Sequence, residues 1–168
     1  MIIRQVIPSD APLLIAFTQA LDSQTPFMLR EPGERQINLE QQKTIIQNTL
    51  KSPVSTMFVV YDPQRNEIVG ICSGVGSPLN KKKHCVHCII GVLEEFQGQG
   101  YGKQLLKKLE VWAKTQNIRR LELTVMEHNY RAINLYDSLG FTAEGLKKDS
   151  IRLNGKFVNE IYMCKLLP

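Results

Sequence analysis

The chain has 168 residues, of which 43% are hydrophobic and 22% charged, and its formal net charge is +5 at neutral pH. This length suits one domain with a sizeable core, and the balance of residues excludes a disordered or fibrous chain. No run approaches the roughly 18 apolar residues that a membrane helix needs. The N-terminus also lacks the regions of a secretory signal peptide. We therefore expect residues 1–168 to form a single cytoplasmic domain with no membrane partner.

The positive charge does not predict a nucleic-acid partner. The only basic block is Lys81-Lys82-Lys83, which follows Pro78 and Asn80 in an expected loop. A solvated loop explains such a short block better than a nucleic-acid surface does.

A metal site is the second class that the sequence argues against. The run from His84 to Cys88 places four potential ligands in five residues, but it lies in an expected strand. Side chains alternate between the two faces of a strand, so Cys85 and Cys88 would point in opposite directions and could not share one tetrahedral zinc ion. We expect no metal.

The first half of the chain predicts a strand, two helices and a hairpin. Asp10 and Pro12 suit the start of the first helix, and Asn38 suits the cap of the second. The expected elements are the strand 2–7, a helix running to about residue 21, an irregular segment 22–36, a helix 38–50, and the hairpin strands 57–61 and 68–75.

The second half predicts two more strands and two more helices around a glycine-rich turn, and then a closing hairpin. Asn154-Gly155 is a strong signal for that hairpin. The expected elements are the strand 84–93, a helix 102–115, a strand 121–126, a helix 129–139, a strand beginning at 141–144, and a strand 156–166. This order predicts a mixed α+β sheet with helices on its faces.

The turn Gln97-Gly98-Gln99-Gly100-Tyr101-Gly102-Lys103 is the most informative segment. Its glycines allow a ligand to approach the backbone, and the helix that follows offers free N–H groups to an anion such as a pyrophosphate. The spacing excludes two common nucleotide motifs. Gln97 and Gln104 replace essential residues of the phosphate loop of NTPases, and Gly102 comes one residue too early for the dinucleotide fingerprint.

Two motifs in register resemble the GNAT acetyltransferases. Val92 followed by Gln97-x-x-Gly100-x-Gly102 is similar to that family's acetyl-CoA signature. Asn129-x-Arg131-Ala132-Ile133-x-Leu135-Tyr136, with Leu123-Thr124-Val125 before it and Gly140-Phe141 after it, is similar to the family's second half.

The resemblance implies an α+β GNAT-like fold with a single mixed, mostly antiparallel seven-stranded sheet and helices on both faces. The sheet is expected to splay into a V between the strand ending near Leu93 and the one starting near Leu121. Acetyl-CoA would bind in this split, without a metal. The implied cofactor-binding residues are Gly91, Val92, Leu93, Gln97, Gly98, Gln99, Gly100, Tyr101, Gly102, Lys103, Asn129 and Tyr136.

Tyr136 is the expected catalytic residue. It lies seven residues after Asn129, about two helical turns of 3.6 residues, so both share a helix face. The resemblance implies that its phenol, protonated at neutral pH, gives a proton to the leaving sulfur. A backbone N–H near Val92 or Leu93 is expected to polarise the thioester. Glu94, Glu95 and His87 are candidates for the base, and none is assigned.

The acceptor amine is expected between the irregular segment 22–36 and the hairpin around 150–157. Phe27, Arg30, Glu31 and Arg35 are candidates for lining that site. The final hairpin is similar to amino-acid or phosphinothricin-type acetyltransferases, which implies direct transfer, in a ternary complex, to the primary amine of a small molecule such as an amino acid or a related amine. It is also similar to acetyltransferases that modify the N-termini of ribosomal proteins. A non-catalytic acyl-CoA sensor is a third reading, and a homodimer is compatible with all three.

Overall fold

A computed structural model describes all residues from Met1 to Pro168 and contains one seven-stranded sheet in the order β1-β2-β3-β4-β5-β7-β6. The strands are β1 (Ile2–Gln5), β2 (Thr56–Asp62), β3 (Glu67–Gly76), β4 (Cys85–Val92), β5 (Arg120–Met126), β6 (Thr142–Leu153) and β7 (Lys156–Leu166). The helices are α1 (Ala11–Gln24), α2 (Leu39–Lys51), α3 (Tyr101–Thr115) and α4 (Tyr130–Ser138), with short 3-10 turns η1 (Pro8–Asp10) and η2 (Glu94–Phe96).

The order of elements predicted from the sequence is confirmed. Asn38 caps α2 as expected, because its side chain accepts a hydrogen bond from the amide of Gln41 at 2.9 Å. The clearest difference is β6, which runs to Leu153 and contains two register shifts, near Ala143/Gly145 and Lys147/Ile151. These irregularities break the alternation of side chains, so the sequence pattern showed only the start of this strand.

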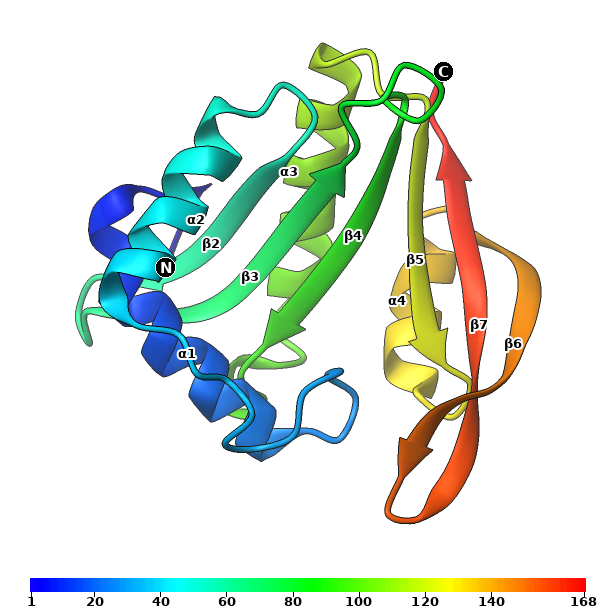
Figure 1. Ribbon diagram of the computed structural model, residues 1–168, viewed down its shortest axis with the longest axis horizontal. Coiled ribbons are helices and arrows are strands. Elements are labelled where there is room, and N and C mark those ends of the chain that lie inside the picture. The colour runs from blue at the N-terminus through cyan, green and yellow to red at the C-terminus, as the bar shows by residue number, and fades with distance from the viewer.

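The sheet divides between β4 and β5, which form its only parallel pair. Their register covers Cys85–His87 against Arg120–Glu122 and no further. Beyond these residues the two strands diverge toward their C-terminal ends, and the predicted V is visible between them (Figure 1). The split leaves backbone groups of β4 without a neighbouring strand.

Helices cover both faces of the sheet, as expected. α1 and α2 lie in front of β1 to β4 in Figure 1, and α3 and α4 lie behind the sheet. Two buried clusters fill these layers. One joins α1 and α2 to residues such as Val59 and Ile71, and the other joins α3 and α4 to residues such as Val86 and Leu123.

The cysteines of β4 follow the predicted alternation. Cys88 packs with Val86 in the cluster beneath α3, whereas Cys85 lies outside that cluster. All four cysteines are buried free thiols. None of the four α-helices is both long enough and apolar enough to cross a membrane.

Candidate functional site

A cleft of about 780 Å³ occupies the split between β4 and β5. Its walls come from the diverging strands, the start of α3, one side of α4 and the segment that follows α1. Because paired strands would fill this space, the cleft is a direct consequence of the short β4–β5 register.

The hydrogen bonds of β4 show which backbone groups face the cleft. The N–H of Leu93 donates to the carbonyl of Val69 on β3 at 3.0 Å, and Val92 lies opposite Gly70. Backbone groups alternate in direction along an antiparallel strand, so the N–H and C=O of Val92 point away from β3 and into the split. Leu93 is therefore excluded as the polarising donor, and Val92 is the remaining candidate of the two.

The glycine turn places an anion-binding backbone at one end of this cleft. Gly98 and Gly100 have φ angles of 77° and 83°, which other residues rarely adopt, and α3 begins at the next residue, Tyr101. Gly102 has a different role, because a Cβ atom there would lie 3.2 Å from the side chain of Leu135 on α4. The turn therefore combines left-handed backbone with close helix packing.

Tyr136 faces the cleft from α4. The residue is only 7% exposed, and its ring packs against Phe141 with 5.8 Å between centroids. Its hydroxyl has no hydrogen-bond partner in the protein, and no fully buried side-chain oxygen or nitrogen is left unpaired, so the hydroxyl retains access to the cleft. Burial raises the pKa of Tyr136 well above its usual value, with a smaller contribution from Cys72 and Cys88. The phenol thus keeps its proton at neutral pH.

Asn129 caps α4 and lines the same cleft. Its side-chain oxygen accepts a hydrogen bond from the amide of Ala132 at 3.2 Å. Asn129 and Tyr136 both contribute to the lining, as their two-turn spacing predicted.

The structure separates the other predicted cofactor residues into two groups. Those that line the cleft with Asn129 and Tyr136 are Gly91, Val92, Gln97, Gly100, Gly102 and Lys103. Those outside the lining are Leu93, Gly98, Gln99 and Tyr101. Gln99 instead bonds the carbonyl of Glu95 at 3.1 Å, and Tyr101 packs against the core beneath α3.

The candidates for the base also fall into two groups. His87 and Glu94 line the cleft. Glu95 forms two hydrogen bonds with Arg65, at 2.8 and 2.9 Å, and these lower the pKa of its carboxyl group. Glu95 therefore lies outside the cleft lining and holds the turn after β4 to Arg65.

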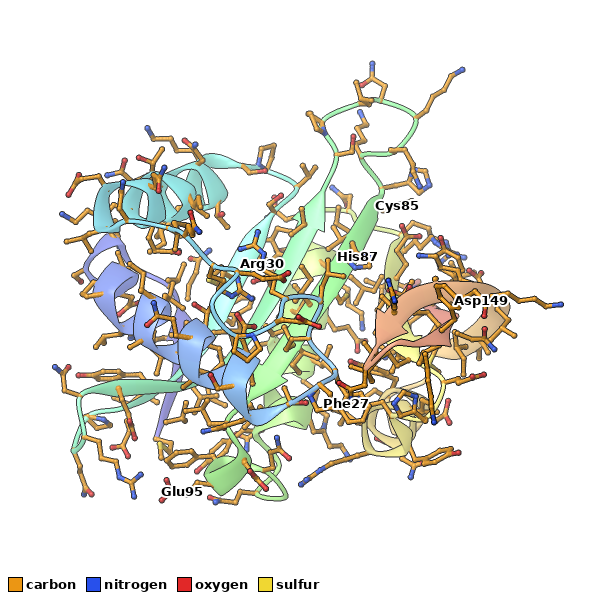
Figure 2. All side chains as sticks on the ribbon, turned by 60° about the horizontal axis from the view of Figure 1, so that its bottom comes forward. Phe27, Arg30, Cys85, His87, Glu95 and Asp149 are labelled. Atoms are coloured by element: carbon orange, nitrogen blue, oxygen red, sulfur yellow. The ribbon has the colours of Figure 1, made fainter.

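Among the acceptor candidates, only Phe27 lines the cleft. Its ring stacks at a tilt against His128, with 5.3 Å between centroids, and so connects the segment after α1 to the turn after β5. Figure 2 shows Phe27 at the point where this segment approaches the β5–β7–β6 half. Arg35 pairs with the buried carboxylate of Asp22, and Arg30 lines a separate hollow against α2.

Two functional candidates were missed by the sequence analysis. Arg131 lines the cleft and donates to the side chain of Gln97 at 2.6 Å, and its position inside the quoted motif was an available signal. Glu160 also lines the cleft, although it lies on β7, beyond β5. Glu160 belongs to the final-hairpin pattern on which the resemblance rests, but the pattern gave it no role, because its approach to the cleft depends on how three strands lie in the sheet.

Comparisons with known proteins agree with this geometry. The sequence profile of the acetyltransferase (GNAT) family matches residues 17–141. The chain is 26% identical over 112 residues to the [Ribosomal protein uS5]-alanine N-acetyltransferase of Escherichia coli, which covers 66% of this chain and 57% of that protein. The matches to the first curated relatives span between about a third and three fifths of those relatives' lengths.

Solved structures extend the likeness over the whole chain. A GNAT-family acetyltransferase from Streptococcus pneumoniae superimposes with a TM-score of 0.95 and 26% identity, covering 99% of both chains. A GNAT superfamily phosphinothricin acetyltransferase from Sinorhizobium meliloti, solved with acetyl-CoA, has a TM-score of 0.84 at 17% identity, covering 99% of this chain and 88% of that one. At that identity the second likeness concerns the fold alone.

Proposed function

Because this chain belongs to the acetyltransferase (GNAT) family, we propose that it is an N-acetyltransferase that uses acetyl-CoA and acetylates a primary amine. One observation carries the proposal: the Tyr136 hydroxyl, the N–H of Val92 and the glycine turn all meet in one cleft. These are the groups needed to hold an acyl thioester and to protonate its leaving sulfur.

The residues present fit acetyl-CoA. The edge of β4 at Val92 has no neighbouring strand, and the Val92 carbonyl, which accepts from Gln97 at 2.8 Å, keeps a second lone pair for an amide of a pantetheine arm. The amides after Gly100, with Lys103 and Arg131 beside them, suit a diphosphate. When bound, acetyl-CoA supplies an acetyl group activated as a thioester.

The chain's own groups would then act at two atoms. The N–H of Val92 points into the split, where it can hydrogen-bond the acyl oxygen and favour attack by a neutral amine. The Tyr136 hydroxyl holds a proton that it can give to the departing sulfur. The amine's own proton leaves to solvent or to a base that we do not assign.

Direct transfer is favoured over a covalent acyl-enzyme. Cys88 is the one thiol that lines the cleft, and burial raises its pKa to about 12. A protonated thiol is a poor nucleophile. We therefore propose a ternary complex in which the amine attacks the thioester itself.

For the acceptor we propose the primary amine of a small molecule. The alternative is a protein N-terminus, which the relationship to the uS5-alanine N-acetyltransferase supports. We also propose that residues 1–168 form a single domain, because one sheet includes all strands from β1 to β7. A cytoplasmic location is proposed as well, since it suits four free cysteines. The homodimer remains a prediction.

A thiol-release assay distinguishes an acetyltransferase from the third possibility, a non-catalytic acyl-CoA sensor. Purified protein, acetyl-CoA and a panel of small amines and peptides are mixed, and free CoA is measured together with the acetylated product. An enzyme releases CoA only when an acceptor is present. Saturable acetyl-CoA binding without turnover of any acceptor would instead identify a sensor.

A further inference from the structure

The charges that line the cleft are unequally divided between its two ends. Its two cationic side chains of lysine or arginine, Lys103 and Arg131, both lie at the glycine turn. Glu160 lies on the face of the sheet that points away from α3 and α4, since its neighbour Ile161 packs into the cluster beneath those helices. The other lining carboxylate, Glu94, is exposed and follows β4.

The part of the cleft around Glu160, which we name the acceptor half, has apolar walls. Phe27 and Met28 come from the segment after α1, Ile89 from β4, Met126 from β5 and Ile151 from β6. Met126 lies opposite Glu160 in the β5–β7 register, so the carboxylate stands among these apolar side chains. An acceptor that enters here leaves water for an environment of apolar side chains that contains one carboxylate.

The Glu160 carboxylate is held in place and kept ionised. Its side chain is 13% exposed, and Lys147 donates to it at 3.1 Å. Partial burial acts to raise the pKa of Glu160, but hydrogen bonds from Thr124, Lys147 and Ser150 outweigh it, so the pKa lies below its usual value. Lys147 does not line the cleft, so the Glu160 carboxylate is the charged group of this pair that an entering ligand meets.

We infer that the acceptor half selects an amine that carries no carboxylate next to the reacting nitrogen. This inference rests on the proposed function and narrows its acceptor class. The Glu160 carboxylate attracts the ammonium form of the amine as it enters, and a carboxylate on the neighbouring carbon would meet Glu160 as a like charge. Free α-amino acids, which the resemblance of the final hairpin implied as acceptors, are therefore disfavoured, whereas simple amines and amino-acid amides, including peptide N-termini, are accepted.

Matched acceptors test the inference on the wild-type protein. Each of several apolar amino acids is compared with three related acceptors: its amide, a peptide with that residue at its N-terminus, and the amine that lacks the carboxylate. For leucine these acceptors are leucinamide, a leucyl tripeptide and 3-methylbutylamine. Because these amines differ in basicity, rates are compared at equal fractions of the neutral form. We expect kcat/KM to be at least ten-fold higher without the carboxylate. The amide and peptide arms distinguish a protein acceptor from a simple amine.

A charge-neutral variant tests the residue itself. Glu160→Gln should raise KM for the preferred amine about ten-fold with little change in kcat, and should reduce discrimination against the free amino acid. Glu144→Gln on β6, whose carboxylate pairs with Arg120 outside the cleft, is the matched control and should keep the wild-type preference. The thermal shift induced by CoA should be equal in all three proteins, which shows that Glu160→Gln folds and binds CoA.

Two results would overturn the inference, and they are distinguishable. If free amino acids react as well as or better than their partners without the carboxylate, the acceptor class is wrong while the acetyltransferase activity stands. If no acceptor reacts although CoA binds, the proposed function fails and the inference fails with it.

Discussion

The side-chain amide of Gln97 donates a hydrogen bond to the backbone carbonyl of Val92, with 2.8 Å between nitrogen and oxygen. The carbonyl end of the same side chain accepts from Arg131 at 2.6 Å. A Cβ atom added at Gly98 would lie 3.5 Å from this guanidinium. One side chain therefore ties the glycine turn to the free edge of β4 and to α4, across the mouth of the split.

Arg131 is expected to bind the diphosphate of the cofactor. Arg131→Met should weaken CoA binding about ten- to a hundred-fold, since a hydrogen bond to a charged group contributes about 1.5–3 kcal/mol. Binding of S-acetylpantetheine, which ends before the diphosphate, should change little. Titration calorimetry measures both affinities. Lys108→Met, an exposed position on α3, is the control for loss of one charge, and equal losses for both ligands would contradict a role at the phosphates.

Gly100 is expected to be needed for its backbone conformation. Its φ of 83° is left-handed, and the nearest atom to an added Cβ is the side-chain nitrogen of Gln104, at 3.9 Å. Gly100→Val should therefore strain the backbone by about 1–2 kcal/mol and greatly reduce the thermal stabilisation by CoA. Gly145→Val is the control, because that position has open space and no left-handed φ. Equal stabilisation of both variants by CoA would show that this turn does not bind the cofactor.

Tyr136 is expected to act on the leaving group. Tyr136→Phe keeps the ring that packs on Phe141 and removes only the hydroxyl, so CoA affinity should be nearly unchanged. The chemical step should slow by about one to three powers of ten in single-turnover experiments with a reactive acceptor. The raised pKa also predicts that wild type loses no rate through the ordinary range of tyrosine ionisation, near pH 10. An equally fast chemical step in Tyr136→Phe would assign the proton donor elsewhere.

Asp10 is expected to contribute stability that depends on pH. Its carboxylate is buried, pairs with Arg4 through contacts of 2.7 and 2.8 Å, and accepts from the amide of Ile7 at 2.9 Å. Burial acts to raise the pKa of Asp10, but the Arg4 and Ile7 hydrogen bonds dominate and lower it.

For a lowered pKa, the stabilisation is complete above the unfolded value, near 3.9, and is lost as pH falls through the folded value. Asp10→Asn should therefore destabilise the protein by about 2–3 kcal/mol at pH 7. This is less than for a fully buried ion pair, because the Arg4 side chain is partly exposed. Urea unfolding at pH 7 and near pH 3 measures the effect, and the gap between wild type and variant should narrow at the lower pH. A gap independent of pH would mean that packing, and not charge, is what Asp10 contributes.

The sequence determined the order of elements, the glycine turn and the placement of Asn129 and Tyr136 on one helix face. These features follow from local rules: the 3.6-residue helix period, the alternation of strand side chains, and the backbone freedom of Gly98 and Gly100. At β6 the same rules gave only the start of the strand, because register shifts interrupt the alternation further along.

Tertiary structure alone decided which groups share the cleft. The hydrogen bond from Leu93 to Val69 shows that Val92, and not its neighbour, faces the split, and this depends on the register of β4 against β3. Glu160 reaches the acceptor half only because β7 lies beside β5. In the β5–β7 register it stands opposite Met126, which comes 34 residues earlier in the chain. Sequence spacing describes contacts within one element, whereas strand order and register set the contacts between elements, so the acceptor site became visible only in the folded chain.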